Sequence, residues 1–130
     1  MIILDTCALV WLVDSPAELS GNAIEAIRKN SDATAVLPIS AWEIALKVRN
    51  GSILMRHSIS PYEWYREVLE DYSLIELPLD AKILCASARL DFIHRDPCDR
   101  MIIAAAIEHK SSVVTADQTF WKYPGVKVIW

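Results

Sequence analysis

Short, continuous apolar runs alternate along the chain with longer stretches of helical periodicity. The runs are typical of strands buried on both faces of a parallel sheet, and they lie at 1–4, 33–37, 74–77, 112–115 and 126–130. Helices are predicted at 7–13, 20–30, 40–50, 60–72 and 80–90 and from 96 onward, with a short turn or helix at 118–121. This alternation predicts an α/β fold, a single three-layer α/β/α domain over residues 1–130 with a central, mostly parallel five-stranded sheet.

Local capping signals mark the starts of several of these helices. Ser20 is predicted to cap one helix, and Ser40 and Ser60 each open a capping box, which in the first case places Glu43 as its acidic member. Asp96 precedes a proline and fits the cap of the last long helix. Taken singly, Glu43 and Asp96 are therefore interpreted as capping residues.

Composition excludes a disordered chain and a membrane-spanning one. The 130 residues are 53% hydrophobic and 23% charged, and no apolar run approaches the roughly 20 residues of a membrane span. An acid, Asp5, arrives before a signal-peptide core can form, so we expect a soluble, cytoplasmic protein with no membrane association. Cys7, Cys85 and Cys98 have no disulfide or zinc spacing and are predicted to be buried thiols.

The negative net charge argues against a protein that coats DNA nonspecifically. The excess of acids makes the Asp and Glu residues candidates for a functional site. The 13 Lys and Arg residues are outnumbered by 17 Asp and Glu residues, which gives a net charge of −4. In a parallel sheet the carboxyl ends of all strands share one edge, where we expect five acids from four separate stretches to meet: Asp5, Glu43, Asp96, Asp99 and Asp117. Asp5 is the best single candidate, because it follows an unbroken apolar strand and has no capping pattern as clear as the others.

Crowded carboxylates raise one another's pKa values unless a cation or a shared proton compensates, so the cluster predicts a metal site. Oxygen ligands without His or Cys at ligand spacing select Mg²⁺ or Mn²⁺, which favours phosphoester chemistry. The phosphate-binding glycine loops and the serine nucleophile elbow are missing from the sequence. An aspartyl-phosphate mechanism is disfavoured because Cys7 stands where the second acid of a D-x-D pair would be.

Four segments together carry a resemblance to a known family: 3–6 (ILDT), 39–45 (ISAWEIA), 94–104 (HRDPCDRMIIA) and 114–117 (VTAD). With them the chain resembles PIN-domain ribonucleases over nearly its whole length, and most closely the VapC-like toxins of toxin–antitoxin operons. The resemblance implies that Asp5, Glu43, Asp99 and Asp117 bind metal, and that Asp96 is more peripheral. It also implies that the hydroxyls of Thr6 and Thr115 orient ligands or the attacking water.

The resemblance further implies an RNA substrate, one or two Mg²⁺ or Mn²⁺ ions, a cognate antitoxin that covers the site, and a homodimer. We expect metal-dependent hydrolysis of RNA phosphodiester bonds by in-line attack of water. Two alternatives stay open: a housekeeping RNA-processing PIN nuclease without an antitoxin, and a binding module whose acidic cleft holds a basic peptide without turnover.

Several side chains near these segments have both a functional and a structural interpretation. Lys47, Arg49 and Arg56 form either an RNA-facing stretch or a solvated face. Arg95 and Arg100 either position phosphates or pair with Asp96 and Asp99. Core or oligomer-interface positions are predicted for the five tryptophans, Trp11, Trp42, Trp64, Trp121 and Trp130, and no catalytic role is assigned to His57, His94 or His109.

Overall fold

The computed structural model describes residues 1–130, and its elements follow the predicted alternation. Five strands are present: β1 (Ile2–Leu4), β2 (Thr34–Val36), β3 (Ile75–Glu76), β4 (Ser112–Val114) and β5 (Lys127–Ile129). Six α-helices accompany them: α1 (Thr6–Asp14), α2 (Gly21–Lys29), α3 (Ile39–Arg49), α4 (Pro61–Asp71), α5 (Ala81–Arg89) and α6 (Pro97–Glu108). Short 3₁₀ turns are η1 (Pro16–Glu18), η2 (Arg56–Ser58) and η3 (Gln118–Lys122). None of the helices has the length and apolarity that a membrane span requires.

The sheet has the order β3-β2-β1-β4-β5, and every pair of neighbouring strands is parallel. Ile2 in the central strand lies opposite Thr34 on one side and Ser112 on the other. The chain leaves β1 toward β2 and β3 and then crosses to β4 and β5 on the opposite side. This reversal opens a crevice beyond the carboxyl ends of β1 and β4, where open α/β sheets place their ligands.

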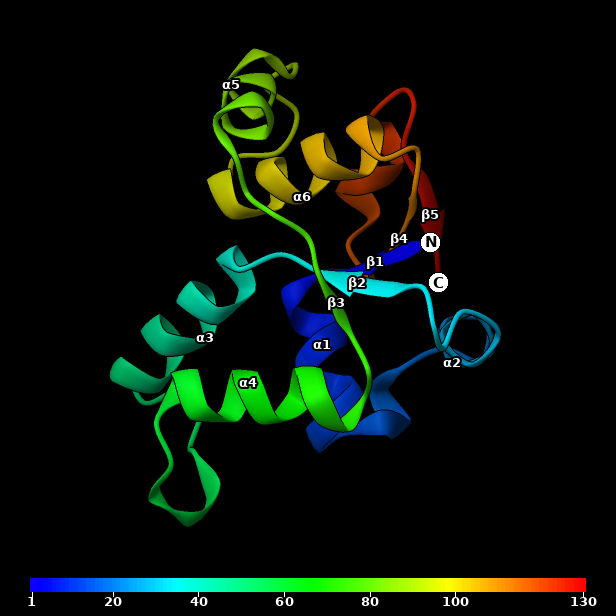
Figure 1. Ribbon diagram of the computed structural model, residues 1–130. Helices are drawn as coiled ribbons and strands as arrows, with labels where there is room; N and C mark the ends of the chain where they lie inside the picture. The colour runs from blue at the N-terminus through cyan, green and yellow to red at the C-terminus, as the bar shows by residue number, and fades with distance from the viewer.

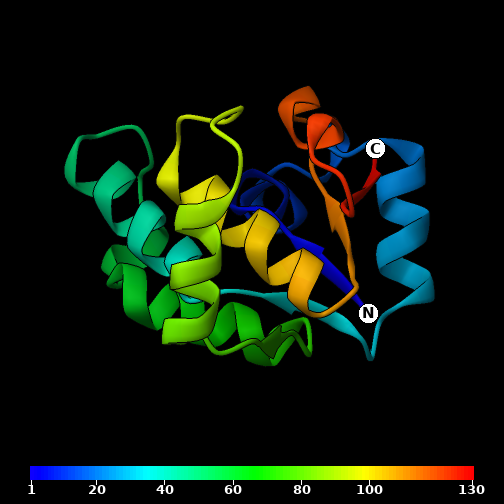
Figure 2. The same cartoon turned by 90° about the horizontal axis from the view of Figure 1, so that it is seen from above.

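Successive residues of the central strand pack into two separate cores, one on each face of the sheet. Ile2 and Leu4 join the core formed with α1, α2, α3 and α4, whereas Ile3 joins the core formed with α5 and α6. The same division is visible in Figure 1, where α5 and α6 lie above the strands and the other helices below, and Figure 2 shows α6 running across the sheet beside α5. The predicted three-layer α/β/α architecture is therefore confirmed, and its sheet is entirely parallel.

Candidate active site

The predicted acids lie at the carboxyl edge of the sheet or at the helix N-termini that face it. Asp5 directly follows β1, Glu43 lies in the second turn of α3, Asp99 lies in the first turn of α6, and Asp117 precedes η3 just after β4. The four acids therefore belong to four different segments of the chain. The tertiary structure therefore brings together acids that are more than 100 residues apart in the chain.

Asp5 is buried, with 6% of its surface exposed, and it is the N-cap of α1. Its carboxylate accepts a hydrogen bond from the Ala8 amide at 2.7 Å. No cap as clear as the others was predicted at Asp5, so this cap is a correction: Asp5 both follows a strand and begins a helix. Burial raises the pKa of Asp5, and the nearby charge of Asp117 adds to the rise, while the Thr115 hydroxyl and the Ala8 amide oppose it.

Glu43 is held by a hydroxyl pair and not by a capping box. The N-cap of α3 is Pro38, so the box predicted for Ser40 and Glu43 is wrong. Thr6 Oγ1 lies 2.5 Å from Glu43 Oε1 and 2.9 Å from Ser40 Oγ. Because a carboxylate only accepts, Thr6 donates to Glu43 and the Ser40 hydroxyl is left to donate to Thr6. The two hydroxyls thus fix Glu43 at the site.

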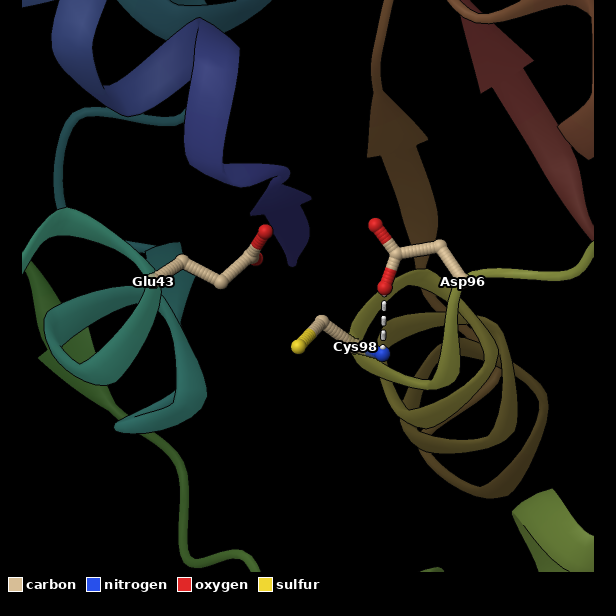
Figure 3. Close-up of side chains that lie close together, drawn as sticks. All are labelled: Glu43, Asp96 and Cys98. Carbon is tan, nitrogen blue, oxygen red and sulfur yellow. Dashed lines mark hydrogen bonds between the residues drawn. The ribbon is translucent and has the colours of Figure 1, made fainter. Parts of the chain in front are cut away.

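Asp96 and Cys98 approach Glu43 from the N-terminus of α6 (Figure 3). Asp96 caps this helix as predicted, with its carboxylate accepting from the Cys98 amide at 2.9 Å. One ligand atom from each of the three side chains lies within 4.8 Å of the others. Cys98 is buried and its pKa is raised to about 12, by desolvation first and then by the charges of Glu43 and Asp96, so it stays a thiol.

His94 joins Asp99 to Asp117, and the sequence analysis gave it no role. Its Nε2 lies 2.7 Å from Asp117 Oδ2 and 3.0 Å from Asp99 Oδ2. Its Nδ1 accepts from the Asp96 amide at 3.1 Å, so the proton that faces the two carboxylates is on Nε2. The edge of the ring packs on Phe120 with the ring centroids 5.8 Å apart. The residue was missed because its segment between α5 and α6 has no periodicity that predicts its position.

Charge repulsion at the site is visible in the pKa values of its acids. Desolvation, then the charge of Asp96, raises the pKa of Asp99 to about 7, and the charges of Glu43 and Asp5 add to the rise. The pKa of Glu43 is also raised, by burial first. For Asp117 burial acts upward, but hydrogen bonds from Thr119 and His94 outweigh it and lower the pKa. Burial is the first cause of the raised pKa values of Asp5, Glu43 and Asp99, and repulsion from neighbouring acids adds to it.

Lys47 supplies positive charge near these acids. It lies one turn after Glu43 on α3, and its charge lowers the pKa values of both Asp5 and Glu43. Of the three basic residues predicted to face RNA, Lys47 is therefore the one whose charge reaches the acids. Arg49 and Arg56 are exposed, in the last turn of α3 and in η2.

Arg100 does not face the cleft, which corrects both roles considered for it. Its guanidinium is buried and donates to the carbonyls of Ser87, Leu90, Asp91 and His94 at 3.0, 2.7, 2.9 and 3.3 Å. It also contacts the Tyr123 hydroxyl at 3.4 Å. Arg100 thus holds the segment between α5 and α6, which carries His94 and Asp96, against the core.

The predictions for the cysteines and the tryptophans are confirmed for some of these residues and wrong for others. Cys98 is buried as predicted, but Cys7 and Cys85 are exposed. Among the tryptophans Trp64 is in the core, and the core interpretation is wrong for Trp42 and Trp121, which are 54% and 61% exposed. The remaining two are partly buried and pack against each other, the rings of Trp11 and Trp130 being 5.8 Å apart.

The chemistry of this donor set fits a hard divalent cation. Carboxylate oxygens predominate, three of the acids carry raised pKa values, and a cation would relieve the repulsion that raises them. The Nε2 atom of His94 lies within hydrogen-bond distance of two of the acids and so holds them in place.

A family model described as the PIN domain matches residues 2–126, and the chain belongs to this family. A curated relative, the ribonuclease VapC22 of Mycobacterium tuberculosis, is 28% identical over 131 residues, which cover 99% of this chain and 98% of the relative. The resemblance seen in the four sequence segments is therefore confirmed at the level of the family.

Solved structures with the same fold include a DNA-bound VapBC from Salmonella typhimurium and VapBC2 from Rickettsia felis bound to a promoter DNA fragment. The first has a TM-score of 0.70 and 18% identity and covers 98% of this chain and 95% of the other. The second has a TM-score of 0.69 and 16% identity, with coverage of 98% and 97%. A toxin–antitoxin complex from Klebsiella pneumoniae has a TM-score of 0.65 and 19% identity, with coverage of 97% and 95%.

The raised pKa of Asp99 predicts how stability depends on pH without metal. Its folded-state pKa of about 7 lies above the ordinary 3.8, so folding takes up a proton there. This contribution is complete below about pH 4 and is lost as the pH rises to about 7. In EDTA we expect Asp99→Asn to raise the unfolding midpoint by on the order of 5 °C at pH 8 and by much less at pH 4, measured by thermal unfolding.

A matched control for this experiment is Asp32→Asn, because Asp32 is exposed before β2, at the opposite end of the sheet. It should leave the midpoint unchanged at both pH values. A midpoint for Asp99→Asn that falls at pH 8, or that shifts equally at both pH values, would contradict the repulsion described above.

The network of Arg100 predicts a large loss of stability on a charge-conserving change. Arg100→Lys keeps the charge but cannot reach the separated carbonyls that the planar guanidinium serves, which leaves buried acceptors unpaired. We expect the free energy of unfolding to fall by about 3 kcal/mol, measured by urea denaturation. Arg89→Lys, at the exposed end of α5, is the control and should change it by less than about 0.5 kcal/mol. An equal, small effect of both changes would show that the network is dispensable.

Proposed function

We propose that the protein is a metal-dependent endoribonuclease that acts in the cytoplasm as the toxin of a toxin–antitoxin pair. The observation that carries the proposal is the convergence of Asp5, Glu43, Asp99 and Asp117 at the carboxyl edge of the sheet, in a chain that the PIN-domain model matches over residues 2–126. The relative VapC22 carries the name ribonuclease, which supports RNA as the substrate.

These four acids are proposed to hold one or two Mg²⁺ or Mn²⁺ ions. When bound, the cation supplies the positive charge that lowers the pKa of the attacking water and offsets the charge of the phosphate. The residues of the chain fix the acids: Thr6 donates to Glu43, the Thr115 hydroxyl bonds to Asp5 and accepts from the Asp117 amide, and His94 spans Asp99 and Asp117. Thr115 is therefore assigned an orienting role in the site.

The bond that breaks joins phosphorus to a ribose oxygen. Water adds its oxygen to the phosphorus, the ribose oxygen leaves with the bonding electron pair and takes up a proton, and a phosphomonoester remains on the other fragment. This reaction requires no 2′-hydroxyl, so a preference for RNA comes from contacts outside the reacting atoms.

A protein partner is supported by apolar side chains left exposed on two packed helices near the acids. Trp42 and Leu46 lie one turn apart on α3 and are 54% and 40% exposed, and Tyr62 on α4 is 70% exposed. An antitoxin segment that covers this face would bury them. The similar structure from Klebsiella pneumoniae is a toxin–antitoxin complex, which agrees with such a partner, and the predicted homodimer is retained as part of the proposal.

The function is tested by cleavage of a labelled RNA pool with antitoxin-free protein in Mg²⁺, in Mn²⁺ and in EDTA. We expect discrete fragments with either metal and none in EDTA. Asp5→Asn and Asp99→Asn should each reduce the rate by at least about 100-fold, because each removes a charge from the metal site. Asp32→Asn, at the opposite end of the sheet, is the matched control and should cleave at the rate of the unmodified protein.

Each result separates two of the functions considered. Cleavage in EDTA, or cleavage that survives both substitutions, would contradict the proposed site. An absence of cleavage together with tight binding of a basic peptide would favour the binding module. Cleavage by a protein whose operon encodes no antitoxin would favour the housekeeping nuclease.

A further inference from the structure

A cavity of about 580 Å³ opens beside Asp117, and the mechanism does not use it. Its lining consists of Ala116, Gln118, Trp121, Lys122 and Trp130. Two of the lining residues, Ala116 and Gln118, flank Asp117 in the chain. A polymer whose phosphate lies at the acids can therefore place a neighbouring unit at this cavity.

The side chains of the cavity suit an unpaired nucleobase. Trp121 leaves 61% of its surface exposed although it is one of the largest apolar side chains, and Trp130 forms a second aromatic surface. Aromatic rings stack on the faces of all bases. The amide of Gln118 offers both a donor and an acceptor to a base edge, and the ammonium group of Lys122 offers a positive charge to a phosphate.

A second cavity repeats this combination of aromatic and cationic groups. It has a volume of about 230 Å³, and Cys7, Trp11 and Lys47 are among its lining residues. Cys7 lies two residues after Asp5, and the charges of Asp5, Lys47 and Asp99 all act on its thiol. Trp130 lines the first cavity and Trp11 lines the second, and the two rings pack against each other with their centroids 5.8 Å apart. Each cavity is also lined by a residue within two positions of an acid of the site in the chain.

We propose that the cavity formed by Ala116, Gln118, Trp121, Lys122 and Trp130 is a subsite for an unpaired nucleobase of RNA next to the phosphate that is cleaved. The assignment rests on the proposed function, because only an RNA bound at the acids brings a base to this position. RNA is favoured over a protein segment because the cavity contributes a lysine beside a cleft that must accept an anionic backbone.

The test is a binding cycle with Trp121→Ala in the Asp5→Asn background, which blocks turnover. The probe is a short fluorescein-labelled uridine oligoribonucleotide, compared with the same strand carrying abasic riboses, and binding is followed by anisotropy in Mg²⁺. Trp121→Ala should weaken binding of the uridine strand about tenfold, the effect of one lost stacking contact, and should change binding of the abasic strand less than about twofold. Trp121→Phe, which keeps an aromatic ring, should restore most of the affinity.

Tyr72→Ala is the matched control, because Tyr72 is also an exposed aromatic residue but lies at the C-terminal end of α4, outside the cavity. It should leave RNA affinity unchanged. Equal weakening of both strands by Trp121→Ala, or none, with cleavage by the unmodified protein intact, overturns the nucleobase subsite alone. A change in oligomeric state by light scattering without a change in RNA affinity also overturns it and assigns the cavity to a protein interface. A failure of the unmodified protein both to bind and to cleave RNA counts against the proposed function instead.

Discussion

Repulsion among carboxylates at one edge of the sheet is the constraint on which the rest of this structure depends. Asp5, Glu43 and Asp99 all have raised pKa values because burial and neighbouring charges disfavour their ionised forms. Such a cluster costs stability, and the fold compensates elsewhere. The two apolar cores, one on each face of an entirely parallel sheet, supply that stability away from the acids.

Hydrogen bonds from side chains and main-chain amides hold the acids in place. His94 donates from Nε2, Thr6 donates a hydroxyl to Glu43, and the helix N-termini offer amide groups to Asp5 and Asp96. The buried cation of the region, Arg100, turns toward main-chain carbonyls and not toward the acids. The acids therefore leave a negative charge at the site that a bound cation can neutralise.

Features encoded within a few residues were predictable from the sequence. Ser20, Ser60 and Asp96 cap helices as predicted, and α3 is followed by Gly51 in the left-handed region, with φ +80°. The order of acids along the chain was likewise enough to place them at one edge, because parallel strands share their direction.

Features decided by tertiary contacts were not predictable. The local pattern assigned Ser40 and Glu43 to each other, but Thr6, more than 30 residues earlier, binds both. Arg100 follows Asp99 directly, and only the packing of α5 on α6 shows that it turns inward to carbonyls. His94 lies in a segment without periodicity, and its role depends on Asp117, which the chain reaches only after α6 and β4.

The negative charge of the acids also bears on how the protein would recognise its proposed RNA substrate. A chain with net charge −4 and a cluster of acids repels a phosphate backbone, so long-range attraction cannot supply most of the affinity for the proposed RNA substrate. Contacts that do not depend on charge must then contribute more, and stacking of bases on aromatic rings is such a contact. Lys122 and Lys47 line the two cavities, and in the proposed function they would offset the repulsion of the RNA backbone there. On this proposal the acids determine which bond is broken, while the surfaces around them determine which RNA reaches it.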